Sequence, residues 1–184
     1  MTQRVIDGNF VYFVTFNVHT RRWFFVTAER AETLGQAMRT CCQMKRFDLL
    51  AYCILPNHVH LLVRRGGAIT SERTLGSMRS EKYDDVKEGV YLFAHRRLPS
   101  RRSVTTPSTL SDLMHSIKST FSQRLRQGKF WHRRSFIRIV GDERYFNHLI
   151  DYIRYNYRKM NLRERYGQAP FVFVDWEAVS RTVG

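Results

Sequence analysis

The chain has 184 residues, a length that fits one domain with its own hydrophobic core. Hydrophobic residues make up 43% of it and aromatic residues 14%, which excludes a globally disordered protein. Its 31 Lys and Arg residues outnumber 16 Asp and Glu, and the net charge of +15 indicates a polyanionic partner, nucleic acid before an anionic membrane surface.

Neither membrane insertion nor a disulfide framework is expected. No apolar run reaches the roughly 18 residues of a spanning helix, and residues 1–7 are too polar for a secretory signal. The cysteines, Cys41, Cys42 and Cys53, are odd in number and lack the spacing of a structural zinc site. A reducing, cytoplasmic setting is therefore predicted.

The first part of the chain predicts a strand, a helix and a hairpin. Residues 10–18 are β-branched and aromatic, which is typical of a strand. Residues 27–46 carry apolar side chains at helical spacing behind a threonine cap. Residues 49–55 and 58–65 predict two strands joined by a Pro-Asn turn.

The second part predicts two helices and two strands after an insertion. Residues 66–108 are rich in Gly, Ser, Thr and Arg and are interpreted as an insertion or long loop. Residues 109–128 open with a capping-box pattern and form an amphipathic helix. A strand over 130–140, a last helix over 142–161 and a short strand within 170–176 complete the chain.

This order of elements predicts an α+β fold of the ferredoxin-like type. We expect an antiparallel sheet with helices on one face, followed by a C-terminal helix, in a single domain over residues 1–184. Such a fold alone does not determine a function.

Two histidines, His58 and His60, lie in the third predicted strand. Side chains two residues apart share a face, so both imidazoles point the same way while Val59 packs on the opposite face. Neutral imidazoles are suitable ligands for a divalent metal, which could bridge the protein to a phosphodiester. The plain alternative is a pair of solvated histidines, and spacing alone does not decide between the two.

Four polar residues recur at helical spacing along the last predicted helix: Tyr145, His148, Tyr152 and Asn156. If this flank faces the histidines, Tyr152 offers a phenolic nucleophile and Asn156 a carbonyl ligand. The alternative is that Tyr152 is a rim residue with a solvated hydroxyl. Tyr155 and Tyr157 are rival nucleophiles on spacing grounds.

Two sequence blocks resemble the REP-associated tyrosine transposases, relatives of the single-tyrosine HUH transposases. The first is YCILPNHVHLLV at residues 52–63. The second starts at Phe130-Trp131 and contains Asp-Tyr-Ile at 151–153, with Asn156 four residues after the tyrosine. The resemblance covers about residues 10–162 apart from the insertion.

This resemblance implies a fold of the HUH nuclease type and a metal-dependent endonuclease and strand transferase that cuts single-stranded DNA. Tyr152 would form a 5′-phosphotyrosine intermediate, while His58, His60 and a third ligand, Asn156, would hold Mg²⁺ or Mn²⁺. The implied substrate is hairpin DNA of repetitive palindromic elements or transposon ends. The implied setting is the nucleoid of a prokaryote, with a monomer or a homodimer both open.

Three features depart from the family pattern. Many relatives have Asn-Pro where this chain has Asn156-Tyr157, residues 66–108 are longer than usual, and the tail has no clear match. None of these removes a chemical group.

Eight basic residues are candidate phosphate contacts: Arg21, Arg22, Lys118, Arg124, Arg126, Lys129, Arg133 and Arg134. Each alone is more often a solvated surface charge, but the set predicts strongly salt-dependent binding. The alternative function is a non-catalytic single-stranded nucleic-acid-binding module with an RNA-recognition-like fold. It explains the charge and the aromatic strands but gives no reason for the histidines and Tyr152.

Overall fold

The computed structural model describes residues 10–66, 108–126 and 128–183. These residues all belong to one of two compact units in the chain, and the other unit, residues 68–107, lies outside the described residues. The predicted insertion at about 66–108 therefore also lies outside them, apart from its ends. None of the described helices is long and apolar enough to cross a membrane.

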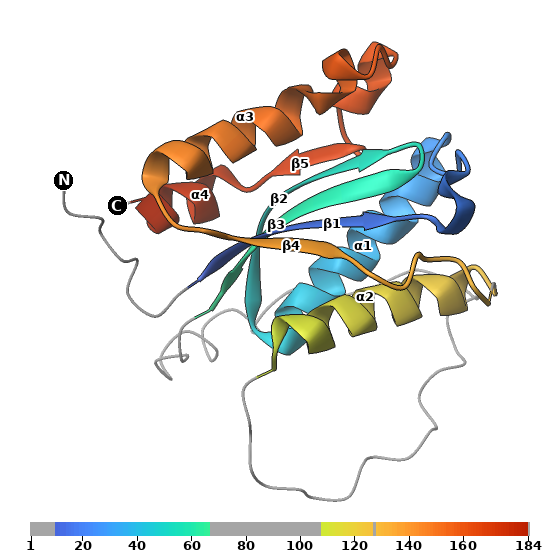
Figure 1. Ribbon diagram of the computed structural model, residues 1–184, viewed down its shortest axis with the longest axis horizontal. Coiled ribbons are helices and arrows are strands. Elements are labelled where there is room, and N and C mark those ends of the chain that lie inside the picture. The colour runs from blue at the N-terminus through green and yellow to red at the C-terminus, as the bar shows by residue number, and fades with distance from the viewer. Residues whose placement is uncertain (1–9, 67–107, 127, 184) are drawn as a thin grey trace, which may run out of the picture. The chain divides into compact units, whose positions relative to one another are not determined.

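The described unit is built on a five-stranded sheet in the order β4-β1-β3-β2-β5 (Figure 1). The strands are β1 (Val11–Asn17), β2 (Phe47–Leu55), β3 (His58–Arg65), β4 (Phe136–Val140) and β5 (Val172–Val174). All neighbouring pairs run antiparallel. The predicted hairpin is confirmed as β2 and β3, and the predicted tail strand as β5.

The helices lie on both faces of this sheet. They are α1 (Ala28–Lys45), α2 (Leu110–Arg124), α3 (Glu143–Lys159) and α4 (Trp176–Val183), with short 3-10 turns η1 (His19–Arg21) and η2 (Glu164–Gly167). In Figure 1, α1 and α2 cover one face, while α3 and α4 cover the other. The predicted pair of helices on one face and the separate C-terminal helix are thus confirmed, and α4 is an element that the sequence analysis missed.

Local capping defines where α2 and α3 begin. The Thr109 side chain accepts a hydrogen bond from the Asp112 backbone N–H, and the Asp112 carboxylate accepts one from Thr109, which completes the predicted capping box. Asp142 caps α3 by accepting from the Tyr145 backbone N–H at 2.7 Å. These caps satisfy N–H groups that have no partner within the helix.

The predicted strand over residues 130–140 is wrong at its start. Phe130 is buried in the core, with its ring centroid 4.6 Å from that of Phe24, and Trp131 forms only an isolated bridge with Val18. The strand begins at Phe136, after a polar stretch. The Phe130 side chain is apolar because it packs into the core, and not because it belongs to the strand that the sequence predicted.

Strand β3 separates two hydrophobic clusters. Val59, Leu61 and Val63 belong to the cluster beneath α1 and α2, whereas Leu62 belongs to the cluster beneath α3 and α4. Because side chains alternate along a strand, His58 and His60 share the Leu62 side and face α3. The predicted placement of Val59 on the opposite face is confirmed.

Candidate active site

The two histidines form one cluster on the sheet face beneath α3. Their ring centroids lie 4.9 Å apart. His60 is only 6% exposed and His58 is half-buried, so the alternative of two solvated histidines does not hold for His60. A buried imidazole needs hydrogen-bond partners, and both rings have them.

Each histidine is held through its Nδ1 atom. Thr15, directly opposite His60 on β1, places its Oγ1 2.8 Å from His60 Nδ1. Asn57 places its Oδ1 2.7 Å from His58 Nδ1. Because an amide oxygen only accepts, His58 Nδ1 is the donor and the lone pair on its Nε2 remains available. Such a contact to the second ring nitrogen orients histidines that ligate metals in proteins.

Both imidazoles are neutral at neutral pH. Burial, and secondly the nearby His58, lowers the pKa of His60 to about 3. Burial also lowers the pKa of His58, with a further contribution from the positive charge of Arg21. Neutral imidazole is the form that binds metal.

Tyr152 reaches the histidines from α3. Its hydroxyl oxygen lies 3.4 Å from His60 Nε2, and the two ring centroids are 5.1 Å apart. Phe13 completes the contact, because it stacks on His60 at 5.4 Å and meets Tyr152 edge-on at 6.0 Å. The polar flank of α3 therefore faces the histidines, as the first of the two interpretations required.

The surroundings of Tyr152 favour its neutral form. Burial raises the pKa of the phenol, and the Asn156 amide acts in the opposite direction. The Lys159 amine lies 5.1 Å from the Tyr152 ring centroid, a cation–π contact with the ring face.

Asn156 is buried, whereas the sequence analysis placed it on a polar flank of the helix. It is 4% exposed, and its Nδ2 atom makes no hydrogen bond of ordinary geometry among the described residues, although the amide lies close enough to the Tyr152 hydroxyl to lower the pKa of that phenol. Leaving a buried polar group without a partner costs about 1–3 kcal/mol, so the position calls for a functional reason. Asn156 follows Tyr152 by one helical turn and can offer its amide oxygen as a ligand.

The rival tyrosines lie elsewhere. Tyr155 is 40% exposed, and its ring packs beneath Arg154 at 4.9 Å. The Tyr157 hydroxyl accepts a hydrogen bond from Arg158, away from the histidines. Within the described part of the chain, Tyr152 is the tyrosine in contact with His60.

The residues present fit a divalent metal with mixed ligands. No group of three or more His, Cys, Asp or Glu residues that could hold a metal occurs in the described ranges. A third protein ligand would be of another type, and the amide oxygen of Asn156, one helical turn after Tyr152, is of a suitable kind. Two imidazole nitrogens and an amide oxygen can bind several divalent metals. Such a ligand set selects for Mg²⁺ or Mn²⁺ less strongly than a set of carboxylates does.

The candidate phosphate contacts differ in their surroundings. Seven of the eight have exposed side chains: Arg21, Arg22, Arg124, Arg126, Lys129, Arg133 and Arg134. Lys118 is half-buried, donates to the His132 carbonyl oxygen at 3.1 Å, and has its pKa lowered by burial. Lys118 therefore also makes a contact within the fold, while Arg21 lies close enough to act on His58.

Sequence reasoning missed two residues that orient the histidines. Thr15 is a polar residue within an apolar strand and shares a face with Phe13. A polar residue at such a position indicates a buried hydrogen-bond partner, here His60 on the neighbouring strand. Asn57 was interpreted only as part of a turn, although its side chain also holds His58.

Comparisons with known proteins agree with this geometry. The sequence model of the family described as "Transposase IS200 like" matches residues 8–83, which include both histidines. The chain is similar to a solved REP-associated tyrosine transposase bound to a REP hairpin, with a TM-score of 0.61 and 18% identity over 100% of this chain and 87% of that chain. A proposed transposase from Deinococcus radiodurans R1 shows a TM-score of 0.45 and 15% identity over 83% of this chain and 95% of that chain. No curated protein matches the sequence.

These comparisons confirm the resemblance to the REP-associated tyrosine transposases and the predicted fold class. At 18% identity the structural likeness establishes the fold, and the chemistry has to be argued from the residues of this chain.

Proposed function

We propose that this chain, which shares the fold of a REP-associated tyrosine transposase and matches the IS200-like family over residues 8–83, is a metal-dependent single-stranded DNA endonuclease and strand transferase. The observation that carries the proposal is the contact between the Tyr152 hydroxyl and His60 across the gap between α3 and the sheet. A structural tyrosine would not need two oriented, neutral histidines and a buried amide beside its hydroxyl.

His58, His60 and Asn156 would hold Mg²⁺ or Mn²⁺. When bound, the metal would offset negative charge on a non-bridging oxygen of the scissile phosphate. The Nε2 atoms of the two histidines would bind the metal, because both Nδ1 atoms have partners, and His60 Nε2 would then give up its 3.4 Å contact with the Tyr152 hydroxyl.

Tyr152 is the nucleophile in this proposal. Its oxygen attacks phosphorus in line, the bond to the 3′ oxygen breaks, and the strand leaves as a free 3′-hydroxyl. The phenol loses its proton as the new bond forms, and the 3′ oxygen gains one. Lys159 favours the developing phenolate by its charge. The 5′-phosphotyrosine bond then allows a second 3′-hydroxyl to reverse the step, which is strand transfer.

The proposed substrate is single-stranded or hairpin DNA at the nucleoid. The net charge of +15 supports a polyanionic partner, and the similar solved transposase is bound to a REP hairpin. Exposed base edges and unstacked nucleotides are available in loops and single strands but not in a continuous duplex.

Covalent capture on a labelled hairpin oligonucleotide with single-stranded flanks tests this function. With Mn²⁺ present, the native chain should form a protein–DNA adduct that survives denaturation, and Tyr152→Phe should form none while binding the DNA with unchanged affinity. The matched variant Tyr145→Phe, on the same flank of α3, should keep the adduct. His58→Ala should lose metal-dependent cleavage.

Adducts formed by Tyr152→Phe would assign the nucleophile to another tyrosine. Undiminished cleavage in EDTA would rule out the metal role. Binding without cleavage by the native chain in either metal would favour the non-catalytic binding module.

A further inference from the structure

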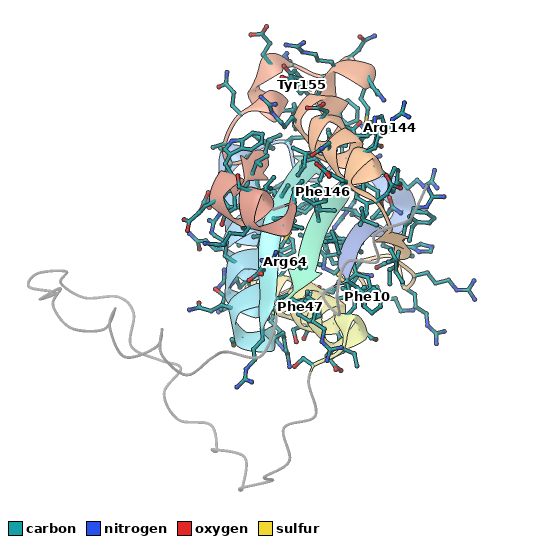
Figure 2. The ribbon with its side chains drawn as sticks, turned by 90° about the vertical axis from the view of Figure 1, so that its left-hand side faces the viewer. Phe10, Phe47, Arg64, Arg144, Phe146 and Tyr155 are labelled. Carbon is teal, nitrogen blue, oxygen red and sulfur yellow. The ribbon has the colours of Figure 1, made fainter. Side chains whose placement is uncertain are left out.

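A separate pocket lies beside the outer face of α3. Its volume is about 230 Å³, and its aromatic and basic lining residues are Arg154, Tyr155, Tyr157 and Trp176, with β5 and Gly167 supplying the remainder. Figure 2 places Tyr155 at the end of the view opposite Phe10. None of the lining residues belongs to the histidine cluster.

Arg154 packs on aromatic rings in this pocket, and Arg158, which does not line it, packs on the same Tyr155 ring. The Arg154 guanidinium carbon lies 4.9 Å from the Tyr155 ring centroid and 5.2 Å from that of Trp176. The Arg158 guanidinium carbon lies 5.1 Å from the Tyr155 ring. Tyr155 is 40% exposed and Trp176 is 53% exposed, so both rings keep surface for a ligand.

The same pattern continues along α3 to the nucleophile. Tyr155 and Lys159 follow Tyr152 by three and seven residues, which places the three side chains on neighbouring positions of the helix surface. Lys159 lies beside the Tyr152 ring, as Arg158 lies beside Tyr155. The pocket residue Tyr155 therefore lies one helical turn from the nucleophile along α3, although the Tyr152 hydroxyl contacts His60 and the Tyr155 ring is exposed.

Single-stranded DNA has the chemistry that this surface fits. Its phosphates pair with cations and its bases stack on aromatic rings, and proteins bind such strands through both kinds of contact together. Two acidic groups oppose it, because the Asp151 carboxylate lies 3.7 Å from Arg154 and Glu164 interacts with Arg158. The ion pair of Asp151 with Arg154 is exposed and weak, so Arg154 remains available to a phosphate.

We propose that the pocket beside Trp176 binds an unpaired nucleotide of the strand whose scissile phosphate lies at Tyr152. The base stacks on Trp176 or Tyr155, and the adjoining phosphate contacts Arg154 or Arg158. This assignment rests on the proposed function for the identity of the strand, but the binding itself needs neither metal nor cleavage.

The test measures the affinity of the full chain for hairpin oligonucleotides with and without a single-stranded extension. EDTA and a Tyr152→Phe background remove any contribution from cleavage. The extension should tighten binding by the native chain. Trp176→Leu should bind the extended hairpin about tenfold more weakly than the native chain does, since base–aromatic stacking is of this size. Trp176→Phe should restore most of that affinity.

Charge variants give a second, independent measurement. Arg154→Gln should weaken binding of the extended hairpin, whereas Asp151→Asn should strengthen it by removing the opposing carboxylate. Two variants serve as matched controls. Lys45→Gln changes the last residue of α1, near Phe47 at the start of β2. Phe10→Leu changes an exposed ring that lies far from Tyr155 in Figure 2. Both controls should bind as the native chain does.

Two outcomes would overturn the proposal. One is an equal loss for hairpins with and without the extension, and the other is a fall in melting temperature with unchanged affinity, which would make the arginine–ring stacking purely structural. Because these readouts are affinities in EDTA, they stay interpretable even if no covalent adduct forms with any metal.

Discussion

At the scale of single residues, burial explains the chemistry of the site. His60 stays neutral because its charged form would lose hydration, and the low pKa of about 3 follows from burial first and from His58 second. Thr15 and Asn57 then fix the rings through their Nδ1 atoms, and His60 Nε2 contacts the Tyr152 hydroxyl. The burial of Asn156 lowers the stability of the fold, because its amide nitrogen makes no hydrogen bond of ordinary geometry within the described chain.

Asn156→Leu tests whether this cost is functional. Replacing an unsatisfied buried amide with an apolar group of similar size should leave the free energy of unfolding unchanged or raise it by about 1 kcal/mol. Mn²⁺-dependent cleavage should nevertheless fall by at least about tenfold if the amide oxygen is a ligand. Urea unfolding and metal titrations of cleavage give the two values.

A variant that is destabilised by several kcal/mol, with cleavage reduced only in proportion to the folded fraction, would instead make Asn156 a structural residue. Asn156→Gln offers the control, because it keeps an amide oxygen on a longer side chain and should retain part of the metal dependence.

At the scale of elements, α3 determines whether the two halves of the site meet. Its buried residues Phe146, Leu149, Ile150 and Ile153 pack against the sheet, and this contact sets the rotation of the helix about its axis. That rotation directs Tyr152 and Asn156 inward and leaves Tyr155 outside. The helix begins at Glu143, and the side chain of the preceding Asp142 caps its first turn.

Asp142→Ala should therefore destabilise the protein by about 1 kcal/mol, because loss of an N-cap leaves a backbone N–H without a partner. Chemical unfolding followed by circular dichroism would measure this change. Asp142→Asn, which keeps an accepting oxygen, should lie close to the native value. Equal destabilisation by both substitutions would show that the carboxylate acts by its charge and not as a cap.

At the scale of the whole molecule, the charge excess governs affinity more than specificity. Seven of the candidate phosphate contacts are exposed, and cations that neutralise phosphates release counterions on binding. Binding of single-stranded DNA should accordingly weaken steeply as salt rises, in proportion to the number of phosphates contacted.

Arg133→Gln and Arg134→Gln should each lower the slope of log Kd against log salt by about 0.7, if each arginine contacts one phosphate of a single strand. Lys45→Gln, at the far end of the sheet from His58, should leave that slope unchanged. Equal slopes for all three variants would show that Arg133 and Arg134 are solvated surface charges.

The sequence by itself determined those features that depend on local geometry. Alternation along a strand placed His58 and His60 on one face with Val59 opposite, because side-chain direction in a strand repeats every two residues. Capping patterns located the starts of α2 and α3, because a cap involves residues three apart. The order of strands and helices was enough for the fold class, which the comparisons confirm.

Only the tertiary structure decided which groups meet across the fold. Tyr152 and His60 are 92 residues apart in sequence, and their contact depends on which sheet face α3 covers and how it is rotated. The burial of Asn156, the contact of Lys118 within the fold and the pairing of Arg154 with Trp176 have the same origin. Periodicity describes one element at a time, whereas these features arise from the packing of separate elements against each other.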